Sequence, residues 1–366
     1  MGSSRSKINT KYKVVDLFCG VGGLTLGLNN TKRFQTIFAN DVDTDMCHAY
    51  SINFPDTEVR SETISSINFN KISEKQKIDV VIGGPPCQAY STSGKRSLTD
   101  PRANLFKEYF RAIKSLNPNI FVYENVKGIF SFKKGKLISE IKELFSSIGY
   151  DLNINLINAA DYGIPQIRER VFVFGVKKGI KFSIPKKTHF SNSEETNYLT
   201  VKDALSDLPR IKNNSSANFY LTKPKSQYQR LMRLKAPKKL MDHNSSKHGN
   251  NLTTFMKFLP EGGLKADIPE EYRPKSGYSN SYGRLWWKKP STTVTRNFGT
   301  PSSARCIHPK VDRALTTREG ARLQSFPDWF QFYGSRAKKN LQIGNAVPPI
   351  LAEKIAESLV ASLDSI

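Results

Sequence analysis

Short apolar runs rich in β-branched and aromatic residues recur through the first 180 residues of the chain, and stripes of helical period separate them. The runs lie at 14–18, 36–39, 78–82, 120–123, 152–156 and 171–176. Such alternation is typical of a mainly parallel β-sheet covered by helices. Ligands bind such open sheets at the carboxyl ends of the strands. The pattern therefore predicts an α/β domain whose site lies in the loops that follow the strands.

The first run leads directly into a glycine turn, Cys19-Gly20-Val21-Gly22-Gly23. Glycine permits positive φ and close approach of a ligand to the main chain, and the helix that follows offers its amino end. The turn therefore predicts a nucleotide-like ligand, although its Gly-x-Gly-Gly spacing departs from the dinucleotide-binding fingerprint. Asp41 ends the second run about 20 positions later, where a Rossmann-type unit binds ribose hydroxyls. A helix N-cap for the segment near Thr44 is the alternative for Asp41.

The third run ends at Gly83-Gly84-Pro85-Pro86-Cys87-Gln88. Pro86 has a fixed φ and restricts Pro85, so the backbone that leads into Cys87 has few states. This geometry makes Cys87 the candidate nucleophile. A buried cysteine that packs as a small hydrophobe is the alternative.

Charged side chains follow the later runs. Glu124 ends the fourth run, and a partly buried glutamate at that edge would have a raised pKa suited to proton donation. Arg168 and Arg170 precede the last run at alternate positions of an extended segment, so both side chains would face the cleft. A loop glutamate exposed to solvent and arginines in surface ion pairs are the alternatives.

The overall charge points to a polyanionic partner. The 366 residues include 56 Lys and Arg against 32 Asp and Glu, a formal charge of +24. Nucleic acid is the commonest polyanion, and a basic solvated surface without a specific ligand is the alternative. No stretch approaches the roughly 18 apolar residues of a membrane span, and no secretory signal opens the chain, so we expect a cytoplasmic protein. The four cysteines, Cys19, Cys47, Cys87 and Cys306, are too scattered to indicate a zinc site or a disulfide framework.

Beyond Lys177 the alternation stops and a second domain is predicted. Ten Lys or Arg residues lie between Arg210 and Lys247 against one acid, Asp242. With interleaved aromatic residues, this mixture is suited to phosphate and base contacts, and a flexible basic loop with sequence-independent affinity is the alternative. Further on, 278–305 would supply scaffold strands, 318–327 a short helix, and Pro349 would lie near the start of the last helix.

Five motifs in this order resemble those of the bacterial cytosine-C5 DNA methyltransferases of restriction-modification systems. They are 16–23 with the glycine turn, 84–88 with Cys87, 124–126 with Glu124, 166–170 with the arginine pair, and Gly344-Asn345-Ala346-Val347-Pro348-Pro349. The resemblance covers nearly the whole chain apart from the basic stretch. It implies a Rossmann-like S-adenosylmethionine-dependent methyltransferase sheet from 1–180 and 340–366. It also implies a smaller, mostly irregular or β domain at 181–339, with a target-recognition region at about 181–290 and a hinge.

The resemblance also implies roles for individual residues. Cys87 would attack C6 of cytosine, Glu124 would bind the N3 and amino edge, and Arg168 and Arg170 would hold the base and the active-site loop. The methyl donor would be S-adenosylmethionine, released as S-adenosylhomocysteine, with no metal. Its pocket would be formed by Phe18, Gly20, Val21, Gly22, Gly23, Asp41, Val42, Ile64, Pro86, Leu105, Asn345 and Val347. The sequence departs from the family where Val42 replaces a common aromatic residue and where Thr63-Ile64 stands for Asp-Ile.

The implied substrate is double-stranded DNA, with the target base flipped into the cleft because cytosine inside a duplex is inaccessible. The loop 89–102 would close over it. The predicted DNA contacts are Gln88, Ser91, Lys95, Arg96, Arg230, Arg233, Lys235 and Arg296. We expect a monomer with no membrane partner, and a cognate restriction endonuclease would not be required for activity. The alternatives are a transfer-RNA cytosine methyltransferase, whose relatives lack a long basic insert, and a DNA-binding relative without catalysis, although Cys87 and Glu124 are both present.

Overall fold

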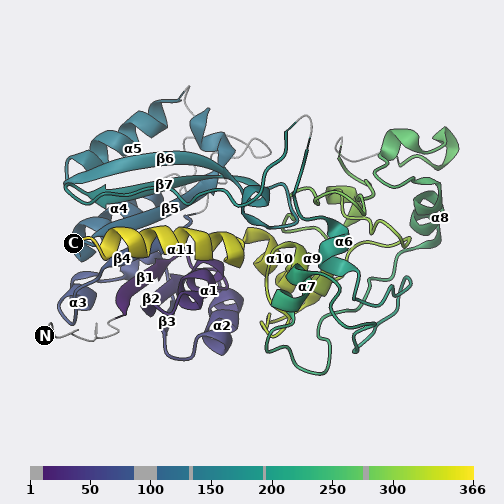
Figure 1. Cartoon of the computed structure of the whole chain (residues 1–366), viewed down its shortest axis with the longest axis horizontal. Coiled ribbons are helices and arrows are strands. Elements are labelled where there is room, and N and C mark those ends of the chain that lie inside the picture. The colour runs from purple at the N-terminus through teal and green to yellow at the C-terminus, as the bar shows by residue number, and fades with distance from the viewer. Residues whose placement is uncertain (1–10, 86–104, 132–134, 193–194, 275–279) are drawn as a thin grey trace, which may run out of the picture.

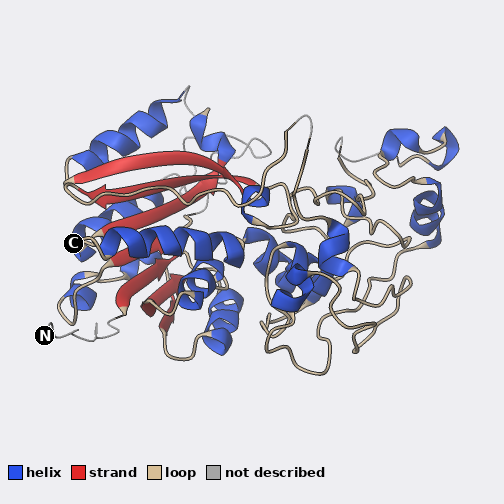
Figure 2. Ribbon diagram, in the orientation of Figure 1, coloured by secondary structure: helices blue, strands red, loops and turns tan. Residues whose placement is uncertain are grey.

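The computed structural model describes residues 11–85, 105–131, 135–192, 195–274 and 280–366. Its centre is a seven-stranded sheet with the order β3-β2-β1-β4-β5-β7-β6 (Figure 2). All neighbouring strands pair in parallel except β7, which runs antiparallel to both β5 and β6. The α/β prediction is confirmed. The strands are β1 (Tyr12–Leu17), β2 (Phe34–Asp41), β3 (Glu58–Ser61), β4 (Val80–Gly83), β5 (Ile120–Val126), β6 (Tyr150–Asn158) and β7 (Glu169–Lys177).

Every predicted apolar run overlaps one of these strands, whereas β3 was not predicted. It is the edge strand beside β2, and Glu58, Arg60 and Ser61 are exposed, so it carries no apolar signal. An edge strand pairs with another strand on one side only, and natural edge strands are often short and polar.

Two layers of helices cover the sheet (Figure 1). Val15 and Leu17 of β1 pack with helices α4 and α5, whereas Val14 packs with α1 and α11 on the opposite face. This alternation follows from the period of two along a strand. Gly27 lets α1 approach α11, because a Cβ there would lie 2.4 Å from the Cβ of Ala352. The helices around the sheet are α1 (Gly23–Asn30), α2 (Thr44–Asn53), α3 (Asn70–Ser73), α4 (Leu105–Leu116), α5 (Lys136–Ser146) and α11 (Pro349–Leu363).

The register aligns the ends of three strands. Leu17 of β1 lies beside Gly83 of β4, and Gly83 lies beside Tyr123 of β5. The strand order changes direction here, since β1 pairs with β2 on one side and β4 on the other. Such a switch point is where open α/β sheets bind ligands. The antiparallel β7 begins at this same edge, so its first residues meet the end of β5.

The region predicted as a second domain, 181–339, lies beside the sheet and consists of short helices and long loops (Figure 1). Met46 and Tyr50 of α2 share a buried cluster with Phe330 and Phe332, which joins this region to the sheet. The predicted short helix at 318–327 is confirmed as α9. The helices are α6 (Val201–Leu205), α7 (Gln227–Met232), α8 (Asn250–Phe258), α9 (Thr317–Leu323) and α10 (Arg336–Asn345).

The scaffold strands predicted at 278–305 are wrong. The described residues of that stretch make only isolated bridges, such as Arg284 with Ile307. There, buried arginine side chains provide hydrogen bonds to backbone carbonyls that neighbouring strands would provide in a sheet. The Arg284 guanidinium donates to the carbonyls of Leu259, Met256, His308 and Val311. Because this side chain satisfies buried carbonyl groups, the loops need no strand pairing to do so.

Candidate active site

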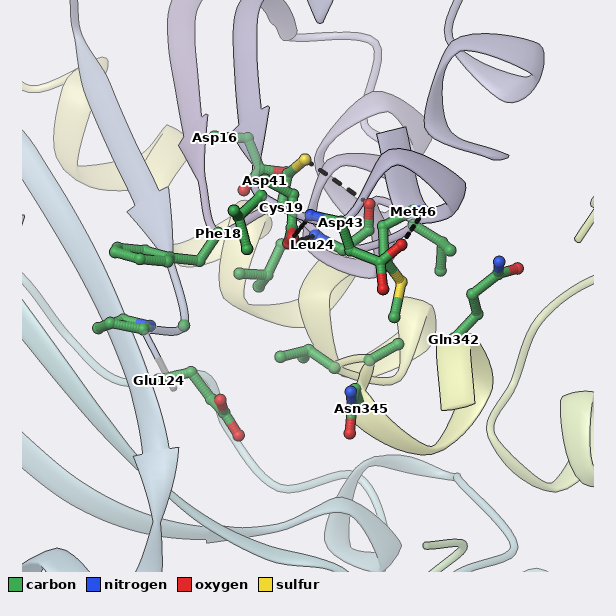
Figure 3. Close-up of a pocket in the computed structure, with 18 of the residues that line it drawn as sticks. Asp16, Phe18, Cys19, Leu24, Asp41, Asp43, Met46, Glu124, Gln342 and Asn345 are labelled. Atoms are coloured by element: carbon green, nitrogen blue, oxygen red, sulfur yellow. Dashed lines mark hydrogen bonds between the residues drawn. The ribbon is translucent and has the colours of Figure 1, made fainter. Parts of the chain in front are cut away.

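A cavity of about 580 Å³ opens at the carboxyl edge of the sheet, where the three strand ends meet. Figure 3 shows Phe18 after β1, Asp41 at the end of β2, Glu124 on β5 and Asn345 at the end of α10 around it. The cavity therefore brings together residues more than 300 positions apart. Other predicted site residues that line it are Gly20, Val21, Gly23, Val42, Ile64, Leu105, Arg168, Arg170, Arg296 and Val347.

The glycine turn is shaped by close packing as well as by backbone conformation. Gly22 has φ +85° and precedes α1, and a Cβ on it would lie 2.4 Å from the ring of Phe54. A Cβ on Gly23 would lie 2.3 Å from the carbonyl oxygen of Val347. Phe18 itself has φ +53°, which is uncommon for a residue with a side chain. Gly23 thus lets the turn meet the 345–347 segment, and Gly22 lets it pack against Phe54.

Asp41 stabilises the glycine turn by hydrogen bonding. One carboxylate oxygen accepts the Gly20 N–H at 3.0 Å, and the other accepts the Asp43 N–H at 3.0 Å. Burial raises the pKa of Asp41 in spite of these hydrogen bonds. Asp43, not Asp41, caps α2 by accepting from the Asp45 and Met46 N–H groups, so the N-cap alternative for Asp41 is wrong. Asp41 remains available as a carboxylate acceptor in the cavity.

Glu124 lies on the other side of the cavity and forms an ion pair with Arg170. The Arg170 Nε lies 3.2 Å from Glu124 Oε1, and the glutamate side chain is only 13% exposed. Burial raises the pKa of Glu124, while Arg170 and then Arg168 act in the opposite direction. Gly84 leaves room for this carboxylate, because a Cβ there would lie 3.1 Å from Glu124 Oε2.

Arg168 faces the same cavity, but carbonyl oxygens take up its guanidinium. It donates to Val294 O at 3.1 Å, Gly344 O at 3.0 Å and Ala346 O at 3.1 Å. Burial, then Arg170, lowers the pKa of Arg168, and Glu124 opposes them. Alternate spacing correctly predicted that both arginines face the cleft, and the structure gives them different partners.

Comparison with known proteins identifies the family. The model of the C-5 cytosine-specific DNA methylases matches residues 12–361. The chain belongs to this family. It is 37% identical over 352 residues to the Type II methyltransferase M1.HphI of Haemophilus parahaemolyticus, covering 94% of this chain and 86% of that protein. It is 36% identical over 371 residues to M.DdeI of Desulfomicrobium norvegicum, covering 94% and 88%.

A solved structure agrees with this assignment. The chain is similar to a crystal structure described as a DNA modification methyltransferase encoded within a prophage of E. coli, with a TM-score of 0.78 and 30% identity. That likeness covers 97% of this chain and 100% of the other. The resemblance read from five sequence motifs is thus confirmed, and the chain is a DNA cytosine-5-methyltransferase.

Several cavity residues of this methyltransferase were not predicted. Asp16 is buried and accepts a hydrogen bond from Thr25 Oγ1 at 2.7 Å, and burial raises the pKa of Asp16 to about 7. Met46 and Glu62 also line the cavity. Met46 lies in the first turn of α2, which begins at Thr44 directly after the Asp41–Asp43 segment, so its place in the chain would have pointed to it.

Six predicted site residues lie outside the described residues: Pro86, Cys87, Gln88, Ser91, Lys95 and Arg96. Gly84 and Pro85, directly before them, line the cavity. Gly22, the remaining predicted cofactor residue, is the N-cap of α1 and packs against Phe54. The other three cysteines, Cys19, Cys47 and Cys306, are buried free thiols.

The predicted DNA contacts of the methyltransferase differ in their surroundings. Arg296 is exposed and lines the cavity. Arg230 and Lys235 are exposed on or after α7. Arg233 donates to Thr222 O at 2.7 Å, pairs with Asp207 at 3.3 Å and stacks 3.8 Å above the Tyr220 ring. Its role in DNA binding stays a prediction, as do those of the other three.

Membrane spans and metal clusters are both absent from the part of the chain that the structure describes. None of the helices there is long and apolar enough to cross a membrane. No group of three or more His, Cys, Asp or Glu side chains among the described residues is arranged to hold a metal ion.

Proposed function

We propose that this methyltransferase transfers the methyl group of S-adenosylmethionine to C5 of a cytosine flipped out of a specific double-stranded DNA sequence. The single observation that carries the proposal is the shared cavity, which joins the glycine turn and Asp41 to the Glu124–Arg170 pair. Its relatives M1.HphI and M.DdeI are Type II methyltransferases, which favours a role beside a restriction endonuclease. The endonuclease would not be needed for methyl transfer.

The residues present fit this methyl donor. A cavity of about 580 Å³ is of the size that cofactors occupy, and Asp41 offers carboxylate oxygens to ribose hydroxyls there. Gly23 lies against Val347 so closely that the turn and the 345–347 segment form one wall. Phe18 and Ile64 would provide apolar contacts for the adenine. When bound, S-adenosylmethionine supplies an electrophilic methyl group.

Glu124 would hold the target base and provide its proton. C5 of cytosine is a weak nucleophile, and addition of a thiolate at C6 makes C5 enamine-like. The addition places negative charge on the ring, which a proton at N3 neutralises. Because burial raises the pKa of Glu124, the carboxyl retains this proton more readily than an exposed glutamate. Arg170 would fix the orientation of the carboxyl through the 3.2 Å contact.

Cys87 would supply the thiolate. Its sulfur would bond to C6, and removal of the C5 proton after methylation would release the sulfur by elimination. The restricted backbone at Pro85 and Pro86 would aim the thiol at one face of the base. The formal charge of +24 favours binding to the phosphates of the duplex, and we expect a monomer to suffice.

Transfer of tritium from labelled S-adenosylmethionine tests the proposal. We expect incorporation into plasmid DNA, with none into transfer RNA, and no detectable incorporation with Cys87→Ala. Cys306→Ala is the matched control, because that cysteine is buried elsewhere and does not line the cavity. Bisulfite sequencing of DNA from expressing cells would give the methylated site. Full activity of Cys87→Ala, or label in transfer RNA alone, would overturn the proposal.

A further inference from the structure

A buried glutamine pair connects the sheet to the second region. Gln166 Nε2 donates to Gln324 Oε1 at 2.6 Å and to Leu323 O at 3.0 Å. Both glutamine side chains belong to fully buried residues. An amide in such a place must find partners for its donors and its acceptor, because a buried polar group left unpaired destabilises the fold. The arrangement of the pair is therefore well defined.

Each glutamine also contacts one wall of the cavity. Gln166 Oε1 accepts the Val294 N–H at 2.8 Å, and Gln324 Nε2 donates to Ala346 O at 2.6 Å. The 291–296 segment ends in Arg296, and both Arg296 and Ala346 line the cavity. Gln166 and Gln324 thus link the 291–296 segment to the segment beside the glycine turn.

Arg168 makes the same connection in parallel. Its guanidinium donates to Val294 O and to Ala346 O, the two residues that the glutamine pair also joins. The Ala346 carbonyl therefore accepts from two side chains, Arg168 and Gln324. A carbonyl has two lone pairs, so this oxygen is fully used.

Two glycines remove the space that would let these segments move independently. A Cβ on Gly344 would lie 2.4 Å from the Arg296 backbone nitrogen. A Cβ on Gly23 would lie 2.3 Å from the Val347 carbonyl oxygen. The 344–347 segment is thus held between the cofactor turn on one side and the 291–296 segment on the other.

We propose that Gln324 is a positioning residue that couples occupancy of the cofactor end of the cavity to the ordering of the 291–296 segment, and through it to DNA binding. The inference rests on the proposed function. A ligand against Asn345 and Val347 restricts the Ala346 carbonyl, and the two donors on that carbonyl transmit the restriction to Val294 and Arg296. DNA then binds a segment that is already ordered, so it loses less conformational entropy. By linkage, DNA tightens cofactor binding by the same factor.

Hydrogen exchange measured by mass spectrometry tests this coupling without DNA, using S-adenosylhomocysteine as the probe. In the unchanged protein we expect saturating probe to slow exchange in peptides that cover 18–25 and in peptides that cover 291–296. The Val294 N–H reports directly, because it donates to Gln166 Oε1. We expect a slowing of at least about fivefold at 291–296, the lower range of coupling between sites.

Two variants separate coupling from folding. Gln324→Met removes both hydrogen bonds of the amide, whereas Gln324→Glu keeps the acceptor for Gln166 and loses the donor to Ala346. In each we expect protection of 18–25 to persist and the slowing at 291–296 to become smaller than in the unchanged protein, because only the Arg168 bonds to Val294 O and Ala346 O remain. Gln331→Met is the matched control, because Gln331 is exposed and should keep both responses.

The outcomes distinguish the two proposals. If the probe fails to protect 18–25 in the unchanged protein, the proposed cofactor site is wrong. If it protects 18–25 but leaves 291–296 unchanged, or if both Gln324 variants keep the full 291–296 response of the unchanged protein, the coupling is wrong. Should Gln324→Met fail to fold, Gln324→Glu decides, and if neither folds, the affinity of the unchanged protein for duplex DNA with and without the probe decides: equal affinities overturn the coupling.

Discussion

Arg170 Nε lies 3.2 Å from Glu124 Oε1, and the sheet register explains why. Arg170 of the antiparallel β7 lies opposite Val126 of β5, two residues beyond Glu124 on the same strand. The two side chains therefore emerge on the same face of neighbouring strands. The pair leaves the carboxyl under two opposing influences, since burial raises its pKa and the arginine lowers it. The proton on Glu124 depends on the balance between them.

Removing Arg170 should shift the pH dependence of methyl transfer. Without the guanidinium, the charged form of Glu124 loses its nearest cation, so the pKa of the carboxyl rises further. If the protonated carboxyl is the active form, activity is lost as pH rises through that pKa. Arg170→Met should therefore move the alkaline limb of kcat/KM to higher pH while lowering the maximum. A pH–rate profile against plasmid DNA measures this.

Arg33→Met is the control for that shift. Arg33 directly precedes β2, so it lies at the amino end of that strand, and it pairs with Asp364. It does not line the cavity. Its limb should stay where it is in the unchanged enzyme. A limb that moves to lower pH in Arg170→Met would contradict the assignment of Glu124 as the proton donor.

Gly23→Ala should weaken cofactor binding. The new Cβ would lie 2.3 Å from the Val347 carbonyl oxygen, a backbone atom that moves only with its whole segment. We expect the Kd of S-adenosylhomocysteine to rise at least about tenfold, equivalent to about 1.4 kcal/mol. Isothermal titration calorimetry measures the change. Gly249→Ala is the control, because a Cβ there meets nothing within 4 Å and φ is −68°, and an equal Kd for Gly23→Ala would exclude this wall from the site.

The sequence predicted the sheet well because its signals are local. Each buried parallel strand is a contiguous apolar run whose end marks the site, so the strand ends alone place Asp41 and Glu124 at one edge. Local sequence patterns could not decide whether Asp41 or Asp43 caps α2, because both carboxylates lie within three residues of the helix start. In the structure only Asp43 accepts from the first helical N–H groups. Local patterns also gave no sign of the exposed edge strand β3.

The second region was less predictable because long-range contacts of charged residues hold it together. Arg313, Arg318 and Arg322 are fully buried, and Arg322 pairs with Asp207, 115 positions away. In the sequence, nothing distinguishes these arginines from those that would contact DNA. Only the structure separates an arginine such as Arg233, which binds within the chain, from Arg296, which faces the cavity.

Acid should destabilise the second region through a buried histidine. His308 Nδ1 accepts the Lys310 N–H at 3.0 Å, and its Nε2 lies 3.8 Å from Glu319 Oε1, with Arg313, Arg210 and His243 nearby. Burial lowers the pKa of His308 to about 3. The unfolded chain binds a proton at this residue below about pH 6.5, and the folded chain does not until about pH 3.

The free energy of unfolding should therefore decrease as pH decreases through that window, and this residue contributes about 1.4 kcal/mol per pH unit. Urea unfolding at a series of pH values between 7.5 and 5 measures the slope. His308→Gln should flatten it by about one proton. An equally steep slope in His308→Gln would show that this histidine is not held neutral.

Salt should separate arginines that contact DNA from those that hold the fold. Phosphate contacts release counterions, so 6–10 of them reduce affinity by about 10³–10⁵-fold between 50 and 200 mM salt. Arg296 is exposed at the cavity, and Arg296→Ala should weaken binding and reduce the slope of log affinity against log salt by about 1. Fluorescence anisotropy with a duplex that carries the mapped methylation site measures both quantities.

Arg233→Ala is the counterpart in the same experiment. Its guanidinium is held by Asp207, Thr222 and the Tyr220 ring, so we expect a lower free energy of unfolding. If these internal contacts persist when DNA binds, the salt slope stays unchanged, and if Arg233 contacts DNA as predicted, the slope falls. Lys235→Ala, exposed two residues later, should reduce the slope if α7 faces the duplex. A reduced slope for Arg233→Ala would mean that its internal contacts open on DNA. An unchanged slope for Arg296→Ala would mean that DNA enters the cavity from another side.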